Sequence, residues 1–165
     1  MEILILSRSK ARKETFNDVL EPAPNIISIT DVGSKDNHFN RFNKLLVCKF
    51  DDIDDLDSDG LIYHNAPTYK DAERIVNFIK GIDDRKLIVH CEAGICRSSA
   101  AAIGAHFIKF GEDGAKERFF PLIGKIFPNE RLAMFIDEAG QLGGEMYLFC
   151  QAINRKSVRE RFLNG

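Results

Sequence analysis

The 165-residue chain has few cysteines, no tryptophan and no long apolar run. No run approaches the roughly 18 apolar residues of a membrane-spanning helix, so we expect no membrane partner. The opening "MEILIL" is too short for a signal-peptide core, and Glu2 stands where such peptides carry a positive charge. We therefore expect a cytoplasmic protein whose four cysteines are thiols rather than a disulfide framework.

Neither sign of charge predominates, because the chain has 23 Lys and Arg and 25 Asp and Glu, for a net charge of -2. This balance gives no electrostatic reason to expect nucleic acid as a partner. The 13 phenylalanines are expected to form core rather than a stacking platform. No repeat or linker divides the chain, so we expect a single domain over residues 1–165.

Apolar patterning places the secondary structure. Short buried strands are expected at 2–6, 25–29, 44–50 and 86–90. Helices are expected at 9–20, 67–82, 98–110, 114–127 (bent near Pro121), 129–141 (capped by Asn129) and 145–162. Thr68 and Asp71 have the spacing of a capping box. Strands and helices alternate early and helices accumulate late, which predicts an α/β fold with a mostly parallel central sheet flanked by helices and a helical C-terminal half.

The stretch "KLIVHCEAGICRSSAAAI", residues 86–103, carries the chemistry. It is predicted to run from a buried strand through a short loop into a helix N-terminus, which is where open α/β sheets bind ligands. Backbone N–H groups of such a loop form a nest for an anion, and the helix dipole adds positive potential. Gly94 allows the backbone to turn without a Cβ clash.

The residue types in this loop fit one task. Cys91 at the base of an anion nest is expected to be a thiolate at neutral pH. Arg97 offers a planar fork for two oxygens of a phosphate-like group. Ser98 can donate a hydroxyl hydrogen bond to the thiolate, and His90 can hold Cys91 in place through the loop backbone.

With these residues, "HCEAGICRS" resembles the signature loop of the cysteine-dependent protein tyrosine phosphatases, in particular the compact dual-specificity branch. The resemblance covers about residues 44–110. It implies a nucleophile, Cys91, that forms a phosphocysteine, with Arg97 stabilising the transition state and no metal or other cofactor. The implied phosphate loop is Glu92, Ala93, Gly94, Ile95, Cys96, Arg97 and Ser98.

The same resemblance implies a general acid on a loop after an earlier strand. "FDDIDDLDSDG" follows the strand expected at 44–50, and some relatives carry a Phe-Asp-Asp stretch there whose second Asp is the acid, which points to Asp52. The spacing of Asp52 from Cys91 is longer than usual in the family, so two alternatives remain. They are Asp51 and Asp59, and Asp59 keeps the shorter spacing. A calcium loop starting at Asp55 is disfavoured, because its twelfth position is Ala66 rather than a bidentate Glu.

The expected function is hydrolysis of phosphomonoesters, with a phosphorylated protein as the default partner and phosphotyrosine as the default group. Phosphoserine, phosphoinositide, RNA 5′-triphosphate or a small metabolite remain open as substrates. A non-catalytic phosphate-binding module is the alternative class, and a sulfurtransferase or arsenate reductase is a third. Cys96 is expected to be a small filler directed away from the site rather than a disulfide partner of Cys91; Cys48 is a further possible partner.

Overall fold

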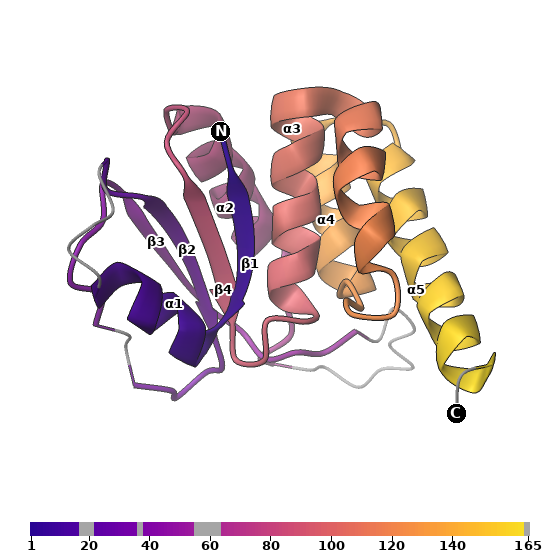
Figure 1. The fold of residues 1–165 in the computed structure, drawn as a ribbon, viewed down its shortest axis with the longest axis horizontal. Coiled ribbons are helices and arrows are strands. Elements are labelled where there is room, and N and C mark those ends of the chain that lie inside the picture. Colours follow the sequence, from indigo (N-terminus) through magenta and orange to yellow (C-terminus); the bar gives the residue numbers. More distant parts are fainter. Residues whose placement is uncertain (17–21, 36–37, 55–63, 164–165) are drawn as a thin grey trace.

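The computed structural model describes residues 1–16, 22–35, 38–54 and 64–163. In these residues the chain forms a four-stranded sheet with helices on both faces (Figure 1). Its strands are β1 (Ile3–Ser7), β2 (Asn25–Thr30), β3 (Leu45–Lys49) and β4 (Leu87–Cys91). They lie in the order β1-β4-β2-β3 and all pair in parallel, which confirms the predicted α/β class and its parallel sheet.

The sheet is apolar along its strands because helices cover both of its faces. β2 and β4 lie in its interior and are buried at every position. In the register of the sheet, Val89 of β4 lies between Ile5 of β1 and Ile27 of β2. The carboxyl ends of the strands meet at one edge of the molecule, the lower edge in Figure 1, and this is the edge at which open α/β sheets bind ligands.

Two apolar clusters pack on the two faces of the sheet. The smaller one joins Ala11 of the first helix and Phe39 to Ile26 and Ile88. The larger one joins the opposite face to the remaining helices. The helices are α1 (Arg8–Phe16), α2 (Tyr69–Gly81), α3 (Arg97–Phe119), α4 (Glu130–Gly140) and α5 (Glu145–Leu163), with a short 3-10 helix, η1 (Phe120–Leu122), after α3. No helix in the described part of the chain is long and apolar enough to cross a membrane.

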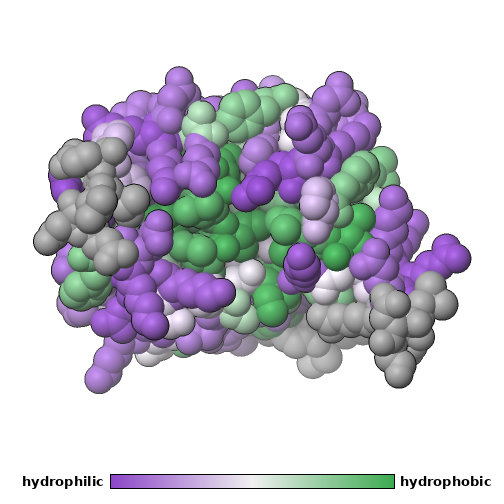
Figure 2. Space-filling model, in the orientation of Figure 1, coloured by the Kyte–Doolittle hydropathy of each residue, from purple (hydrophilic) through white to green (hydrophobic). Residues whose placement is uncertain are grey.

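β1 forms one edge of the sheet, next to α3. On the side of the molecule that faces the viewer in Figures 1 and 2, apolar side chains reach the surface in the middle, over β1 and the adjoining part of α3, and hydrophilic side chains surround them. The hydrophilic side chains of this side therefore lie mainly around the margin of the apolar area. α1 lies on that margin, beside the loop that leaves β4.

The predicted capping box starts α2. The Thr68 hydroxyl accepts from the Asp71 N–H at 3.3 Å, and the Asp71 carboxylate accepts from the Thr68 N–H at 3.1 Å. The helix buries Ala72, Ile75, Val76 and Ile79, the apolar face that its periodicity predicts. These contacts fix α2 against the sheet.

The helical prediction beyond residue 110 was partly wrong. Residues 97–119 form one helix that is kinked at Gly111, whose φ of 74° is outside the helical region. The segment predicted to be helical to residue 127 stops at Phe119, and Pro121 then lies in η1. Pro121 has no N–H to continue the helix, and Gly124 has a φ of 83°, so the chain turns back toward the loop that follows β4.

Candidate active site

Cys91 is the last residue of β4 and lies at the base of the predicted phosphate loop. Its thiol sulfur is 3.2 Å from the Ser98 hydroxyl and accepts from the Gly94 N–H at 3.3 Å. Only 2% of Cys91 is exposed. The structure thus brings Cys91 and Ser98 into the contact that the sequence predicted, with a backbone donor added.

Gly94 cannot be replaced by a residue with a side chain without moving the loop. Its φ is +75°, and a Cβ atom would lie 2.6 Å from the backbone of Leu6 and Ser7. The loop is therefore pressed directly against the end of β1. This close approach gives a second reason for glycine, beyond the turn that the sequence predicted.

The carbonyl groups of the loop are bonded to its surroundings. The Glu92 carbonyl accepts from Arg8, the Ile95 carbonyl from Phe127 and the Cys96 carbonyl from Asn129, at 3.2, 3.1 and 3.3 Å. In a trans peptide the N–H of the next residue points the opposite way. The N–H groups that follow these three carbonyls are thus directed to the inside of the loop, where an anion nest requires them.

The side chains of the loop are divided between solvent and neighbouring elements. Glu92 and Ala93 are exposed, and Glu92 forms an ion pair of 3.3 Å with Arg8 at the start of α1. Ile95 and Cys96 are half-buried. The phosphate loop is therefore attached to α1 on one side and to the segment before α4 on the other.

His90 is fully buried behind Cys91. Its Nδ1 lies 3.4 Å from the Cys91 carbonyl, as predicted, and its Nε2 lies 2.9 Å from the Ser28 hydroxyl of β2, which the sequence did not reveal. Burial lowers the pKa of His90 from 6.5 to about 4. At neutral pH the imidazole is therefore uncharged, and it links β2 and β4 behind the nucleophile.

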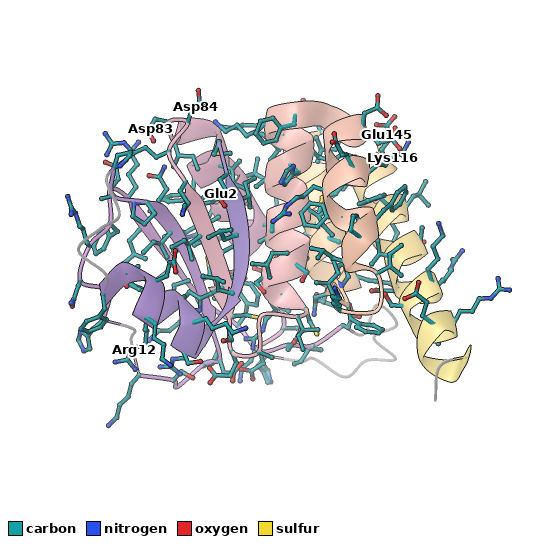
Figure 3. The ribbon with its side chains drawn as sticks, viewed as in Figure 1. Glu2, Arg12, Asp83, Asp84, Lys116 and Glu145 are labelled. Carbon is teal, nitrogen blue, oxygen red and sulfur yellow. The ribbon has the colours of Figure 1, made fainter. Side chains whose placement is uncertain are left out.

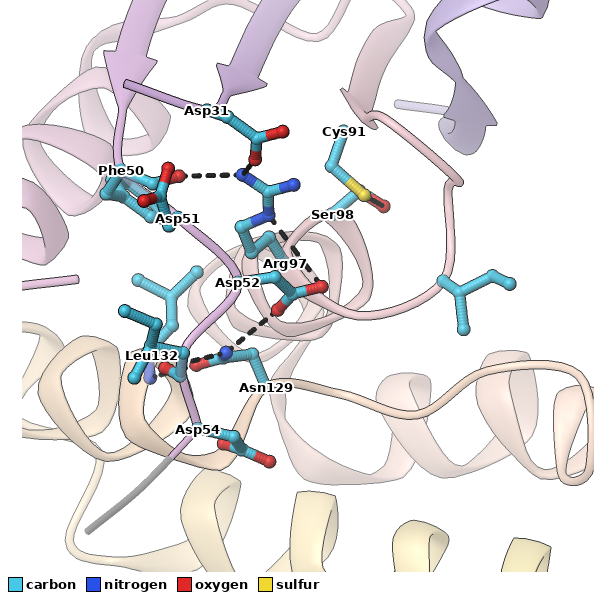
Figure 4. Close-up of polar contacts among 12 residues, drawn as sticks. Asp31, Phe50, Asp51, Asp52, Asp54, Cys91, Arg97, Ser98, Asn129 and Leu132 are labelled. Carbon is cyan, nitrogen blue, oxygen red and sulfur yellow. Dashed lines mark hydrogen bonds and ion pairs between the residues drawn. The ribbon is translucent and has the colours of Figure 1, made fainter. Parts of the chain in front are cut away.

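Arg97 has contacts with other segments of the chain that were not predicted from the sequence. Its Nη1 donates to the Phe50 carbonyl at 2.7 Å and forms an ion pair with Asp31 at 2.6 Å (Figure 4). These two contacts use both N–H groups of Nη1. Its Nε is buried and has no hydrogen bond to any described residue. The guanidinium edge formed by Nε and Nη2, which can hold two oxygens side by side, is therefore not occupied by these contacts.

Asp31 is a site residue that the sequence analysis missed. It follows β2 directly, and β2 is the neighbour of β4 in the sheet. A carboxylate at the end of a buried strand is a usable signal, but its value depends on knowing which strands are adjacent. With the strand order known, Asp31 and Cys91 are expected at the same edge.

The aspartates of residues 51–54, here called the acid segment, differ in what they contact. Asp51 accepts from the Val32 N–H at 3.0 Å, and Asp54 accepts from the N–H groups of Glu130 and Arg131 at the start of α4. Asp52 accepts from no backbone N–H of the described residues, and its Oδ2 lies 3.8 Å from Arg97 Nε. Of the two candidates that the structure describes, Asp52 is therefore the one beside Arg97; Asp59 and the calcium loop starting at Asp55 lie outside the described residues.

Asn129 ties the acid segment to the rest of the site. Its side-chain amide donates to Asp52 Oδ1 at 3.0 Å and to the Ile53 carbonyl at 3.1 Å. Its side-chain oxygen accepts from the Leu132 N–H at 2.8 Å, which caps α4 as predicted. With its backbone N–H on the Cys96 carbonyl, Asn129 connects the phosphate loop, Asp52 and α4.

Cys96 is half-buried, and its thiol lies near enough to Asp52 to be affected by the charge of that residue. Burial, together with the charge of Asp52 and a hydrogen bond to it, raises the pKa of the Cys96 thiol to about 12. Burial likewise raises the pKa of Cys48 to about 12. All four cysteines are free thiols. The Cys96 thiol is therefore neutral at pH 7.

Comparison with known proteins supports the fold. No family model and no curated protein matches the chain. A solved structure that matches is that of the human tyrosine phosphatase-like serine/threonine/tyrosine-interacting protein, with a TM-score of 0.58 and 21% identity over 86% of this chain and 92% of that chain. The chain thus has a tyrosine phosphatase-like fold.

Proposed function

We propose that the protein is a phosphomonoester hydrolase that acts through a phosphocysteine intermediate, with phosphotyrosine on protein as its default substrate. The observation that carries the proposal is the juxtaposition of three groups from β4, α3 and the acid segment. The Cys91 sulfur lies between Ser98 and the Gly94 N–H, Arg97 Nε has no hydrogen bond to any described residue, and Asp52 Oδ2 lies 3.8 Å from that Nε.

In the first step the Cys91 thiolate forms a bond to phosphorus while the ester P–O bond breaks. Arg97 and the inward N–H groups of the loop hold the three equatorial oxygens, whose charge grows in the transition state. Asp52 gives its proton to the leaving oxygen, so the alcohol departs neutral. Asn129, which holds one oxygen of Asp52, leaves the other directed toward the site.

In the second step water attacks the phosphocysteine. Asp52, now a carboxylate, takes a proton from that water as its oxygen bonds to phosphorus and the P–S bond breaks. Cys91 leaves as a thiolate, and the Ser98 hydroxyl at 3.2 Å can donate to it. The products are inorganic phosphate and the regenerated site. Because Cys91 must stay reduced, we further propose that the protein works in a reducing compartment such as the cytoplasm.

The test compares p-nitrophenyl phosphate with a phosphotyrosine peptide, using the native protein, Cys91→Ser and Asp52→Asn. We expect Cys91→Ser to abolish hydrolysis of both esters. Asp52→Asn should slow hydrolysis of the phosphotyrosine peptide by about 100-fold or more and that of p-nitrophenyl phosphate much less, since nitrophenolate leaves without a proton. Equal losses on both esters would remove the acid role from Asp52.

A binding module without turnover is the second candidate. The name of the matching human structure, a tyrosine phosphatase-like interacting protein, favours considering it. If the native protein releases no phosphate from either ester but binds the phosphotyrosine peptide, and Arg97→Ala abolishes that binding, the module is the better account. If it neither hydrolyses nor binds either ester, both proposals are wrong.

A further inference from the structure

The strand order places opposite charges on the two sides of Cys91. β4, which ends in Cys91, lies between β1 and β2. The basic helix α1 follows β1, whereas Asp31 follows β2 and the acid segment follows β3. Because all strands are parallel, these segments start at the same edge of the sheet, with α1 on one side of the phosphate loop and the aspartates on the other.

One face of α1 is basic and borders a hollow in the surface. Ser9, Arg12, Lys13 and Phe16, here called the α1 face, line a surface hollow of about 550 Å³. Their spacing places them on one side of the helix. Arg12 and Lys13 are exposed, and Phe16 has 54% of its surface exposed. Figure 3 shows Arg12 on α1 at the lower edge of the molecule, the edge at which the phosphate loop lies in Figure 1.

α1 is held firmly against the phosphate loop. Its first residue, Arg8, donates its backbone N–H to the Glu92 carbonyl at 3.2 Å and pairs with the Glu92 carboxylate at 3.3 Å. The helix rises about 1.5 Å per residue, so Arg12 lies about 6 Å along it from Arg8. An extended peptide covers about 3.3 Å per residue, so the α1 face lies roughly two to four peptide residues beyond Arg8, which contacts the phosphate loop.

We propose that the α1 face binds an acidic segment of the substrate peptide on one flank of its phosphorylated residue, while the aspartates across the site disfavour acidic residues on the other flank. This inference rests on the proposed function and names the class of substrate. Arg12 and Lys13 would pair with Asp or Glu side chains of the peptide, and Phe16 would pack on their aliphatic parts or on a neighbouring apolar residue. The site would thereby select the direction in which a phosphopeptide lies.

The experiment uses four phosphotyrosine peptides of one sequence. They carry no acidic residue, glutamates two to four residues before the phosphotyrosine, glutamates two to four residues after it, or both. We expect one singly acidic peptide to exceed the neutral peptide in kcat/KM by about fivefold at low salt, and the other to equal it or fall below it. The advantage should shrink as salt screens the exposed charges.

A matched pair of variants locates the effect. Arg12→Glu/Lys13→Glu should remove the advantage of the preferred acidic peptide. Arg155→Glu/Lys156→Glu, which reverses another adjacent Arg-Lys pair exposed on α5, should keep it. Equal kcat/KM for all four peptides, a best rate for the doubly acidic peptide, or the same loss in both variants would overturn the inference.

The outcome can be separated from that of the proposed function. Hydrolysis of the neutral peptide tests the function alone. If no peptide is hydrolysed, the same four peptides are compared by fluorescence anisotropy for binding to the native protein and to Cys91→Ser. The same ranking in affinity, and its loss in Arg12→Glu/Lys13→Glu, would support the α1 face. Equal affinities, or an absence of binding by any peptide, would overturn it.

Discussion

Replacing Asp31 tests whether the ion pair with Arg97 positions the guanidinium for phosphate. Asp31→Asn keeps an oxygen that can accept from Nη1 but removes the charge. The Arg97 side chain is 4% exposed and that of Asp31 is 46% exposed, so the pair is partly screened by water. A charge-assisted hydrogen bond contributes about 1 kcal/mol more than a neutral one, so we expect a loss of about fivefold in kcat/KM. Asp31→Ala removes the ion pair altogether and should lower kcat/KM by about 10- to 30-fold. The loss should be no larger, because the Phe50 carbonyl still accepts from Nη1.

The assay measures kcat and KM for both p-nitrophenyl phosphate and a phosphotyrosine peptide. In the proposed mechanism Arg97 contacts the phosphoryl oxygens and not the leaving group, so both esters should lose the same factor. Asp83→Asn is a suitable control, since Asp83 pairs with Arg85 at 3.1 Å and is 49% exposed, but lies at the opposite edge of the molecule (Figure 3). A loss below twofold on both esters would refute the positioning role. A loss confined to the phosphotyrosine peptide would instead make Asp31 the proton donor.

Three further predictions concern stability and the shape of the loop. Burial lowers the pKa of His106 from 6.5 to about 4, so the unfolded chain takes up a proton at a higher pH than the folded chain does. The free energy of unfolding should therefore fall as the pH drops from 6.5 toward 4. In urea unfolding, His106→Leu should make the fall in this free energy between pH 7 and pH 5 smaller by about 2 kcal/mol. Gly94→Ala should destabilise the fold by about 1–3 kcal/mol and abolish binding of tungstate in calorimetry, whereas retained binding would contradict the close packing on β1. Asn129→Asp keeps an oxygen for the α4 cap but replaces the donor to Asp52 and the Ile53 carbonyl by a buried carboxylate, so it should lower the melting temperature and slow phosphotyrosine hydrolysis; unchanged rates would show that the contact of Asn129 with Asp52 is dispensable.

The sequence predicted those features that depend on local patterns. The four strands, the capping box of Thr68 and Asp71 and the Asn129 cap each rest on residues close together in the chain, and the structure has all of them. The contact of Cys91 with Ser98 also lies within one loop. Local spacing was sufficient here because these interacting groups are at most seven residues apart in the chain.

The features that the sequence did not predict depend on how distant segments meet. Asp31 reaches Arg97 only because β2 lies next to β4, and Asn129 reaches Asp52 only because the chain turns back after η1. The end of α3 was misplaced because apolar periodicity continues past Pro121 while the helix does not. Asp51 and Asp52 likewise have partners in distant segments, the Val32 N–H and Arg97 Nε, which the spacing of the aspartates does not reveal.

The central claim is that Cys91 becomes phosphorylated during turnover. The most direct measurement is an acid quench within the first turnover on p-nitrophenyl phosphate, followed by mass spectrometry of the peptide that contains Cys91. We predict phosphate attached to Cys91 in the native protein and none in Cys91→Ser. Hydrolysis that proceeds with no phosphate on Cys91, or that persists in Cys91→Ser, would contradict the mechanism.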